Sequence, residues 1–454
     1  MHGPATPFVL ESFPRKSRPH IIVIGHGVCG KLVVSKLLAN DHAQRQEMQP
    51  VPEREGFRER TESKVRRLIK DALADKLSVT ITVVESRDFY EADALGPMYL
   101  SKPYFRAYRS LRQAETRCRG VTYVQGTVDK LEHEGSTGFA VTIGSKVLHA
   151  TAIVLCTGTS VPVMKPLVGQ EEVSRLAELN EARMAIRSAR RVLIAGGGAV
   201  GIESAGGVKE LMRSDAKLTI VMSEALPLTA AQPIWLREAL AQQLAADGVE
   251  LIANAKVLGS LDYCAVPGRY ELSSGHAIEA DVFLPLFTTC PTAFLRHVEG
   301  ATDSRGRLRI EPATLQSTAL PGLFAVGCSD LTNQPGELLN VGRFGAQAQC
   351  AATNAVHHAR GEELMRYQPA ANGLYGVALA KCGFLTDGSE PWITCKCPSR
   401  QPNSQPSCCP AKRAMQHASL PAACLLPLST LCLLCAVSLS VHRSPRQHQR
   451  LHAH

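Results

Sequence analysis

The sequence predicts an α/β protein in which one domain with a parallel sheet is inserted into another. Three observations favour this fold. Two turns, Gly25–Gly30 and Gly196–Gly201, both have the spacing Gly-x-Gly-x-x-Gly. Each follows an uninterrupted apolar run, which is typical of a strand buried on both faces of a sheet. Each also precedes apolar residues at helical spacing, and strand, glycine turn and helix in this order indicate a βαβ unit of the nucleotide-binding type.

Length, composition and charge fit this interpretation. A chain of 454 residues is long enough for two or three domains. The hydrophobic content of 45% and the charged content of 20% are ordinary for a globular protein. The formal net charge is +9, but seven lysines and arginines and one acid, Glu390, lie from residue 390 onward. The rest of the chain is close to neutral, so we expect no nucleic-acid partner.

Cysteine usage gives no sign of a metal site or of a secreted protein. Eight of the fifteen cysteines are scattered before residue 390 without metal-like spacing, and isolated cysteines usually act as small buried hydrophobes. No cleavable secretory signal is recognisable, so we expect an intracellular location, in the cytoplasm or at a membrane. Residues 1–19 are interpreted as a disordered lead-in, although a fragment of a mitochondrial transit peptide would have a similar composition.

The first half of the chain predicts one nucleotide-type unit with a charged insertion. A strand at 21–24 and a helix at 31–40 flank the first glycine turn, and the next apolar strand, 79–84, ends at Glu85. The polar residues 41–77 between them are interpreted as an insertion that is part loop and part solvated helix. Residues 121–128 and 139–147 predict antiparallel strands, and a further apolar strand at 152–155 leads into Cys156-Thr157-Gly158.

The pattern then begins again. After a linker and helix at 160–188, strand 191–195, the second turn and helix 202–212 repeat the first unit, followed by strands 218–222 and 249–252 and helix 234–246. Residues 282–286 are expected to lead back to the first domain, and 323–327 to add another strand to it. We therefore predict two Rossmann-like domains in a three-layer ββα arrangement, with the second inserted in the first. The predicted boundaries are 20–165 with 281–360 for the first domain, 166–280 for the second, 361–390 for a truncated C-terminal module and 391–454 for a tail.

The two glycine turns are suited to a dinucleotide. A pyrophosphate dianion binds where a helix N-terminus offers free N–H groups and the positive end of the helix dipole. The three glycines of such a turn permit a tight bend, close approach of the phosphate and packing of helix on strand. These roles are predicted for Gly25, Gly27 and Gly30 in the first turn and for Gly196, Gly198 and Gly201 in the second.

The strand that follows each turn differs in the residue at its end. Glu85 lies where a carboxylate accepts hydrogen bonds from ribose hydroxyls, and the insertion accounts for its long separation from the first turn. The alternative is a solvated acid at a strand end. In the second unit the same position is Met222, and Glu224 follows two residues later. No arginine is recognisable near it in the sequence to bind a 2′-phosphate, which favours NADH over NADPH.

Four motifs together resemble a known superfamily. The first glycine turn, Cys156-Thr157-Gly158, the segment Gly196–Glu203 and the segment Pro321–Gly327 occur in the order found in flavoproteins with two dinucleotide-binding domains. Within that superfamily the chain is similar to the apoptosis-inducing-factor-2 (ferroptosis-suppressor) branch, which is related to type II NADH dehydrogenases. The stretch from Val84 to Tyr90 and on to Pro103 resembles the segment after the ribose acid in that branch, and the resemblance covers residues 20–385.

The resemblance implies a role for each motif. The first turn, with Glu85, Val128, Thr157 and Gly158, would bind FAD, and the second would bind NAD(P)H. Glu203 would lie near the stacked flavin and nicotinamide rings. The family pattern after residue 326 is Gly-Asp, with the acid on the ribityl chain of FAD. Here the residues are Gly327-Cys328-Ser329-Asp330, so Asp330 is the candidate substitute.

One feature distinguishes subclasses within the superfamily. Its disulfide reductases carry a Cys-x4-Cys pair beside the flavin, and this sequence contains no such pair. We therefore expect electrons to pass from NAD(P)H to the flavin and directly to an external acceptor, for which the resemblance implies a quinone. Two alternatives stay open, a non-catalytic or FAD-poor regulatory homologue, suggested by Cys328, and a ferredoxin-type reductase on the same scaffold.

The tail has two interpretations. Residues 418–441 carry no charge and are long enough to cross a bilayer, and Lys412, Arg413 and Arg443 flank them. Pro421 and Pro427 weaken a helix there. The segment is therefore either a membrane anchor, which would place the protein at a membrane surface, or part of a disordered tail.

Overall fold

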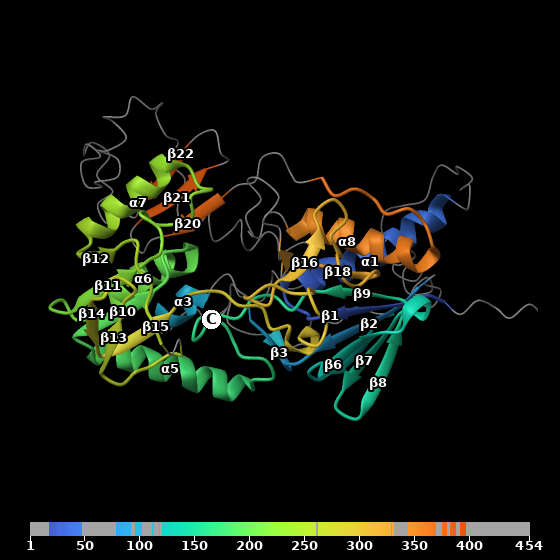
Figure 1. Cartoon of the computed structure of the whole chain (residues 1–454), viewed down its shortest axis with the longest axis horizontal. Helices are drawn as coiled ribbons and strands as arrows, with labels where there is room; N and C mark the ends of the chain where they lie inside the picture. Colours follow the sequence, from blue (N-terminus) through green and yellow to red (C-terminus); the bar gives the residue numbers. More distant parts are fainter. Residues whose placement is uncertain are drawn as a thin grey trace, which may run out of the picture.

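The fold was determined as a computed structural model. It describes residues 18–47, 79–91, 96–101, 111–112, 118, 120–259, 262–327, 329–330, 344–368, 375–378, 382–386 and 391–395. Most of the predicted insertion, the lead-in and the possible anchor at 418–441 lie outside these residues. Figure 1 shows two α/β domains next to each other, with a small sheet beside the second domain.

The first domain is built on an eight-stranded sheet. Its central strands β1, β2, β5, β9 and β18 are parallel, in the order β18-β9-β1-β2-β5, and β16, β17 and β19 extend one edge. The bounds are β1 (His20–Ile24), β2 (Thr80–Glu85), β5 (Thr122–Gln125), β9 (Ala152–Leu155), β16 (Leu308–Glu311), β17 (Gln316–Ser317), β18 (Leu323–Ala325) and β19 (Ser329–Asp330). The apolar side chains of β1 and β9 are buried on both faces, as the continuous apolar runs predict.

Two further layers cover this sheet (Figure 1). Helices α1 (Val28–Glu47) and α8 (Phe344–Arg360) pack together on one face, where Val33, Val34 and Leu37 are buried. On the other face lies an antiparallel sheet of β6 (Lys130–His133), β7 (Phe139–Ile143) and β8 (Lys146–Ala150), with a short 3-10 turn at Gly135–Thr137. The predicted ββα layering is confirmed, and α1 continues to Glu47, into the segment that the sequence assigns to the insertion.

One predicted strand pairing is wrong. Residues 121–128 were expected to pair antiparallel with 139–147, but β5 pairs parallel with β2, and the antiparallel partners of β7 are β6 and β8. The cause is physical, because an alternating pattern identifies a strand but not the strand that it pairs with.

The second domain repeats the parallel arrangement. Its sheet has the order β12-β11-β10-β15, with all neighbours parallel. The elements are α5 (Glu172–Ser188), β10 (Arg191–Ala195), α6 (Ala199–Leu211), β11 (Lys217–Val221), α7 (Ile234–Ala246), β12 (Val249–Ile252), β13 (Gly268–Glu271), β14 (Ala277–Ala280) and β15 (Val282–Pro285). Strand β15 corrects a prediction, because residues 282–285 complete this sheet beside β10 instead of leading back to the first domain. A short run that is buried on both faces fits either sheet equally well.

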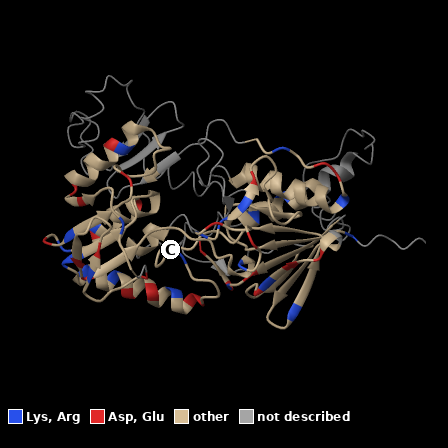
Figure 2. Ribbon diagram, in the orientation of Figure 1, with Lys and Arg blue, Asp and Glu red and all other residues tan. Residues whose placement is uncertain are grey.

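The remaining elements lie outside the two parallel sheets. A three-stranded antiparallel sheet of β20 (Tyr375–Ala378), β21 (Cys382–Thr386) and β22 (Pro391–Cys395) extends past the predicted boundary at residue 390. A 3-10 turn spans Ala293–Leu295. None of the helices described is long and apolar enough to cross a membrane. Figure 2 shows acidic and basic residues interspersed along α5 and around the second domain.

The first domain sends a short segment onto the second. After β2 the chain forms β3 (Phe89–Tyr90), which pairs with β4 (Leu111–Arg112), and then α3 (Gly96–Ser101). Helix α3 packs against α6, where a Cβ added to Gly207 would lie 2.6 Å from the Cβ of Ser101. Gly207 therefore allows the two helices to approach closely. Figure 1 shows α3 at the junction of the two domains.

Candidate functional site

The two glycine turns are built from the same hydrogen bonds. In each, the first glycine donates to the end of the neighbouring strand, and the second glycine accepts the first bond of the helix. The donor and acceptor pairs are Gly25 N to Val84 O at 2.8 Å and Lys31 N to Gly27 O at 3.1 Å, then Gly196 N to Val221 O at 2.9 Å and Ile202 N to Gly198 O at 3.0 Å. The duplication seen in the sequence is therefore a duplication of backbone geometry.

The first and third glycines of each turn are required by packing. Gly25 and Gly196 have φ angles of +99° and +130°, which residues with a side chain rarely adopt. A Cβ at either would also meet the carbonyl oxygen of Cys156 or Leu286 in the adjoining chain. A Cβ at the third glycine would overlap the carbonyl of the first in both turns, at Gly30 and Gly201. These four positions shape the turn whether or not a ligand is present.

The middle glycines are different, because no protein atom accounts for them. A Cβ added to Gly27 or Gly198 would meet no heavy atom of the described chain within 4 Å. Both residues directly precede a helix, so the open space lies where unpaired N–H groups and the helix dipole favour an anion. The geometry fits a pyrophosphate at each turn, as the sequence predicts.

Glu85 reaches the first turn directly. Its buried carboxylate accepts hydrogen bonds from the backbone N–H of His26 at 2.7 Å and of Arg87 at 3.1 Å. Because each carboxylate oxygen can accept more than one hydrogen bond, the group can still accept from a ribose hydroxyl. Glu85 is thus not a solvated acid at a strand end, and its contact with His26 supports the turn as well.

The other residues predicted for FAD lie at four places in the first domain. Thr157 and Gly158 follow β9 beside the first turn, and the buried hydroxyl of Thr157 has no hydrogen-bond partner within the described part of the chain. Gly327 is close to the start of α1, since a Cβ there would lie 2.8 Å from the sulfur of Cys29. Val128 is buried in the loop after β5. Asp330 lies in β19, paired with β16, and its side chain is outside the described residues, so its role stays a prediction.

Lys31 is a residue of this site that the sequence analysis missed. Its ammonium group lies 3.2 Å from the centre of the Tyr90 ring, directly after the first turn. Burial lowers the pKa of Lys31 to about 7, although the negative charge of Glu85 opposes the shift. A bound dianion would favour the charged form of the amine. Its position directly after Gly30 is the sequence signal that would have drawn attention to it.

The second turn lacks a carboxylate at the equivalent position. Met222 is buried, and a Cβ added to Gly197 would lie 2.5 Å from the Met222 Cβ, so this side chain packs on the turn. The expectation that no arginine lies near is wrong, because the Arg237 Nη2 atom is 3.6 Å from a Glu224 carboxylate oxygen. Arg237 lies on α7, and no local pattern could have placed it there.

Glu203 lies on the side of the second domain that faces α3. It belongs to the start of α6, four residues before Gly207, so the two residues share one face of the helix. Gly207 contacts Ser101 of α3. This position is compatible with the predicted proximity of Glu203 to the flavin and nicotinamide rings, which stays a prediction.

Comparisons with known proteins agree with this geometry. The sequence profile of the pyridine nucleotide-disulphide oxidoreductase family matches residues 15–352. An FAD-dependent oxidoreductase of Flammulina velutipes is 29% identical over 249 residues, which are 54% of this chain and 74% of that protein. A nitric oxide reductase FlRd-NAD(+) reductase of Salmonella gallinarum is 29% identical over 40% of this chain, and the match spans 47% of that protein.

Solved structures share the fold at low sequence identity. The water-forming NADH oxidase of Lactobacillus brevis superimposes with a TM-score of 0.55 at 14% identity, over 81% of this chain and 74% of that one. The sulfide:quinone oxidoreductase of Aquifex aeolicus gives 0.55 and 14%, over 83% and 86%. The family binds FAD and uses NAD(P)H as co-substrate, in agreement with the two glycine turns. The chain therefore belongs to the pyridine nucleotide-disulphide oxidoreductase family, a family of FAD- and NAD(P)H-dependent oxidoreductases.

Proposed function

We propose that this oxidoreductase passes electrons from NADH through FAD directly to a quinone-type acceptor, as a relative of the apoptosis-inducing-factor-2 branch. The observation that carries the proposal is the composition of α3. This helix, Gly-Pro-Met-Tyr-Leu-Ser, follows the ribose-side strand β2 and packs against α6 of the second domain, and it buries Tyr99 and Leu100. It holds no thiol, so it offers no dithiol to act as an electron relay. Direct transfer from flavin to a diffusible acceptor is the simpler route.

The chain's own residues would hold the two dinucleotides and keep the flavin and nicotinamide rings stacked against each other. The N–H groups at the starts of α1 and α6 would bind the two pyrophosphates, with Gly27 and Gly198 leaving room for them. Glu85 and Thr157 would bind FAD on the first side, and Glu203 would lie near the nicotinamide. FAD, when bound, supplies the acceptor for hydride and passes electrons on singly or in pairs. No protein acid or base is needed for the hydride step.

The preference for NADH is inferred from Glu224 and Arg237. The only cation that the structure places beside Glu224, within the described residues, is Arg237, which is 10% exposed. Its Nε and Nη2 atoms donate to the carbonyls of Pro227 at 3.1 Å and Leu226 at 3.3 Å. Arg237 therefore stabilises the loop after β11, while the Glu224 carboxylate, 46% exposed, would repel a 2′-phosphate.

Replacing Glu224 by glutamine should shift the coenzyme preference toward NADPH. Because a repulsive charge is removed, we expect the ratio of kcat/KM for NADPH to that for NADH to rise about tenfold, equivalent to about 1.4 kcal/mol. Steady-state rates with both coenzymes measure this ratio. Glu238→Gln, an exposed acid on α7, is the matched control and should leave it unchanged. An unaltered ratio in Glu224→Gln would show that this carboxylate does not select the coenzyme.

The choice of acceptor is tested by supplying NADH with one acceptor at a time. We expect a short-chain ubiquinone analogue to support faster NADH oxidation than ferredoxin or oxygen. Rapid ferredoxin reduction with no response to quinone would favour the ferredoxin-type alternative. Protein that stays colourless after FAD is added would favour the regulatory one. Association with a membrane surface is a further part of the proposal, and it is tested by the binding of the full chain to lipid vesicles.

A further inference from the structure

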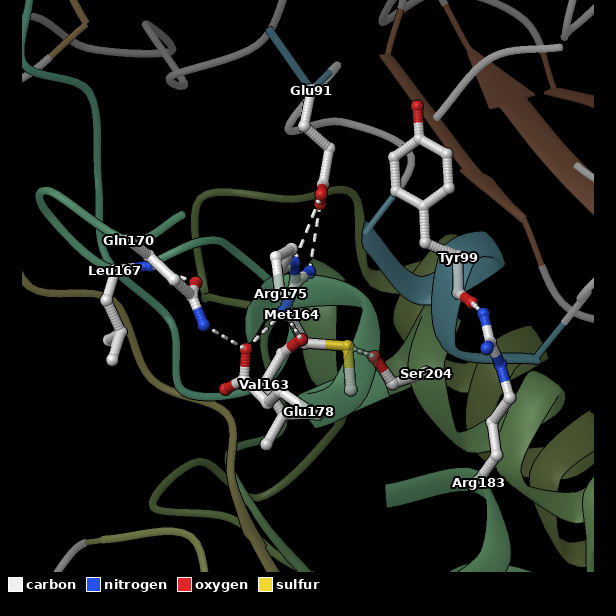
Figure 3. Close-up of polar contacts among 10 residues, drawn as sticks. All are labelled: Glu91, Tyr99, Val163, Met164, Leu167, Gln170, Arg175, Glu178, Arg183 and Ser204. Atoms are coloured by element: carbon white, nitrogen blue, oxygen red, sulfur yellow. Dashed lines mark hydrogen bonds and ion pairs between the residues drawn. The ribbon is translucent and has the colours of Figure 1, made fainter. Parts of the chain in front are cut away.

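A buried ion pair connects the two domains close to α3. Glu91 follows β3 of the first domain, and Arg175 lies in the first turn of α5 in the second. The Arg175 Nη2 and Nε atoms lie 2.9 and 3.1 Å from the two carboxylate oxygens of Glu91. The two side chains are 1% and 4% exposed. Figure 3 shows the guanidinium and the carboxylate facing each other, joined by two hydrogen bonds. Such a bidentate pair fixes the relative orientation of the two side chains as well as their separation.

Arg175 donates two further hydrogen bonds. Its Nη1 atom donates to the carbonyl of Val163 at 2.7 Å and to Glu178 at 2.9 Å. Glu178 in turn accepts a hydrogen bond from Gln170 at 3.1 Å. Burial disfavours the charge of Arg175, but the charges and hydrogen bonds of Glu91 and Glu178 together outweigh it, so the pKa of Arg175 lies above its usual value. Four hydrogen bonds therefore hold the charged guanidinium in place between the domains.

A second arginine of α5 contacts the far end of the same segment. Arg183 donates from Nε to the carbonyl of Leu100 at 3.0 Å and from Nη2 to the carbonyl of Tyr99 (Figure 3). These carbonyls belong to the last turn of α3, where a cation is favoured by the helix dipole. Helix α5 thus contacts the segment 91–101 both before α3 begins and where it ends.

We propose that Glu91, Arg175 and Arg183 are positioning residues for hydride transfer, which hold α3 between the two dinucleotide sites and so set the approach of the nicotinamide to the flavin. The inference rests on the proposed function. Glu91 lies six residues after Glu85, on the FAD side, and α3 ends against Gly207 of α6, the helix that begins at the second glycine turn. Hydride transfer needs reacting atoms about 3–3.5 Å apart, and a displacement of about 1 Å can cost about 100-fold in rate.

The decisive variant replaces both charges by apolar side chains of similar size, Glu91→Leu with Arg175→Met. Neither charge of the pair is left buried alone, and Glu178, whose side chain is 23% exposed, keeps its hydrogen bond from Gln170, so we expect the double variant to fold. The FAD-loaded double variant should bind NADH with an affinity within about twofold of the wild-type value, while its rate of flavin reduction falls by about 10- to 100-fold. The long-wavelength absorbance of the stacked flavin–nicotinamide complex should weaken. Arg213→Gln with Asp215→Asn, an exposed ion pair within the second domain, is the matched control and should change neither the reduction rate nor this absorbance.

A readout without any cofactor separates this inference from the proposed function. In FAD-free protein, hydrogen–deuterium exchange of the peptide containing 96–101 should be slow in the wild type and faster in the double variant. Arg175→Lys keeps the positive charge but cannot make the two parallel hydrogen bonds to Glu91. We expect this variant to reduce its flavin at least about tenfold more slowly than the wild type. Wild-type reduction rates and wild-type exchange in the double variant would overturn the inference. Wild-type protein that NADH does not reduce would overturn the proposed function, while the exchange data would still show whether the pair holds α3.

Discussion

Replacing Gly27 by valine should give a folded protein that no longer binds FAD. A Cβ added to Gly27 would meet no heavy atom of the described residues within 4 Å, so we expect a valine side chain to be accommodated in the unliganded chain. Valine at the start of a helix is expected to cost about 1 kcal/mol of stability or less. In the liganded state the same side chain would occupy the space of the pyrophosphate, and we expect the dissociation constant for FAD to rise at least about 100-fold, or about 2.7 kcal/mol.

The measurement is FAD binding to apoprotein, followed by flavin fluorescence, together with thermal unfolding of the unliganded variant. Gly25→Ala serves as the contrasting control. At Gly25 a Cβ meets the carbonyl of Cys156, and φ is +99°, so that variant should lose stability even without ligand. Wild-type FAD affinity in Gly27→Val would place the pyrophosphate elsewhere.

The second glycine turn should give the reciprocal result. Gly198→Val is expected to bind FAD normally but to lose reduction by NADH, with kcat/KM at least about 100-fold lower. The backbone of Gly198, with φ −73° and ψ 179°, suits a residue with a side chain, so the fold should be preserved. The reason is the same as at Gly27, since a Cβ added to Gly198 would meet no heavy atom of the described residues within 4 Å and a bound phosphate would compete for this space.

Anaerobic mixing with NADH checks this result, and dithionite provides the control because it reduces flavin without a coenzyme site. We expect dithionite to bleach the flavin of Gly198→Val and NADH to leave it oxidised. Equal loss of FAD in both glycine variants would contradict the assignment of one dinucleotide to each turn.

Local sequence patterns were sufficient for the two turns because their geometry is local. Gly25 and Gly196 need a positive φ, and the first and third glycines of each turn, five residues apart, contact each other, so the motif and its structure coincide. Glu85 was identified for the same reason, since it ends the strand that pairs with β1. Its hydrogen bond to the His26 N–H was not foreseen, because a backbone donor leaves no trace in the sequence.

The strand pairings and ion pairs that were missed involve partners outside the local sequence segment. Residues 282–285 were assigned to the first domain because a fully buried strand carries no mark of the sheet that it joins. Arg237 belongs to a helix after the loop of Glu224, and Arg175 is 84 residues from Glu91. The contact of Arg237 with Glu224 forms only when the second domain folds, and the contact of Arg175 with Glu91 only when the two domains pack together.

The most direct test of the central claim is the visible spectrum of the full-length protein before and after anaerobic addition of NADH. If FAD binds at the first turn and receives electrons from NADH at the second, protein that contains FAD absorbs at about 450 nm, and addition of NADH bleaches this absorbance. Protein that stays colourless after FAD is added, or flavin that neither NADH nor NADPH bleaches, would contradict it.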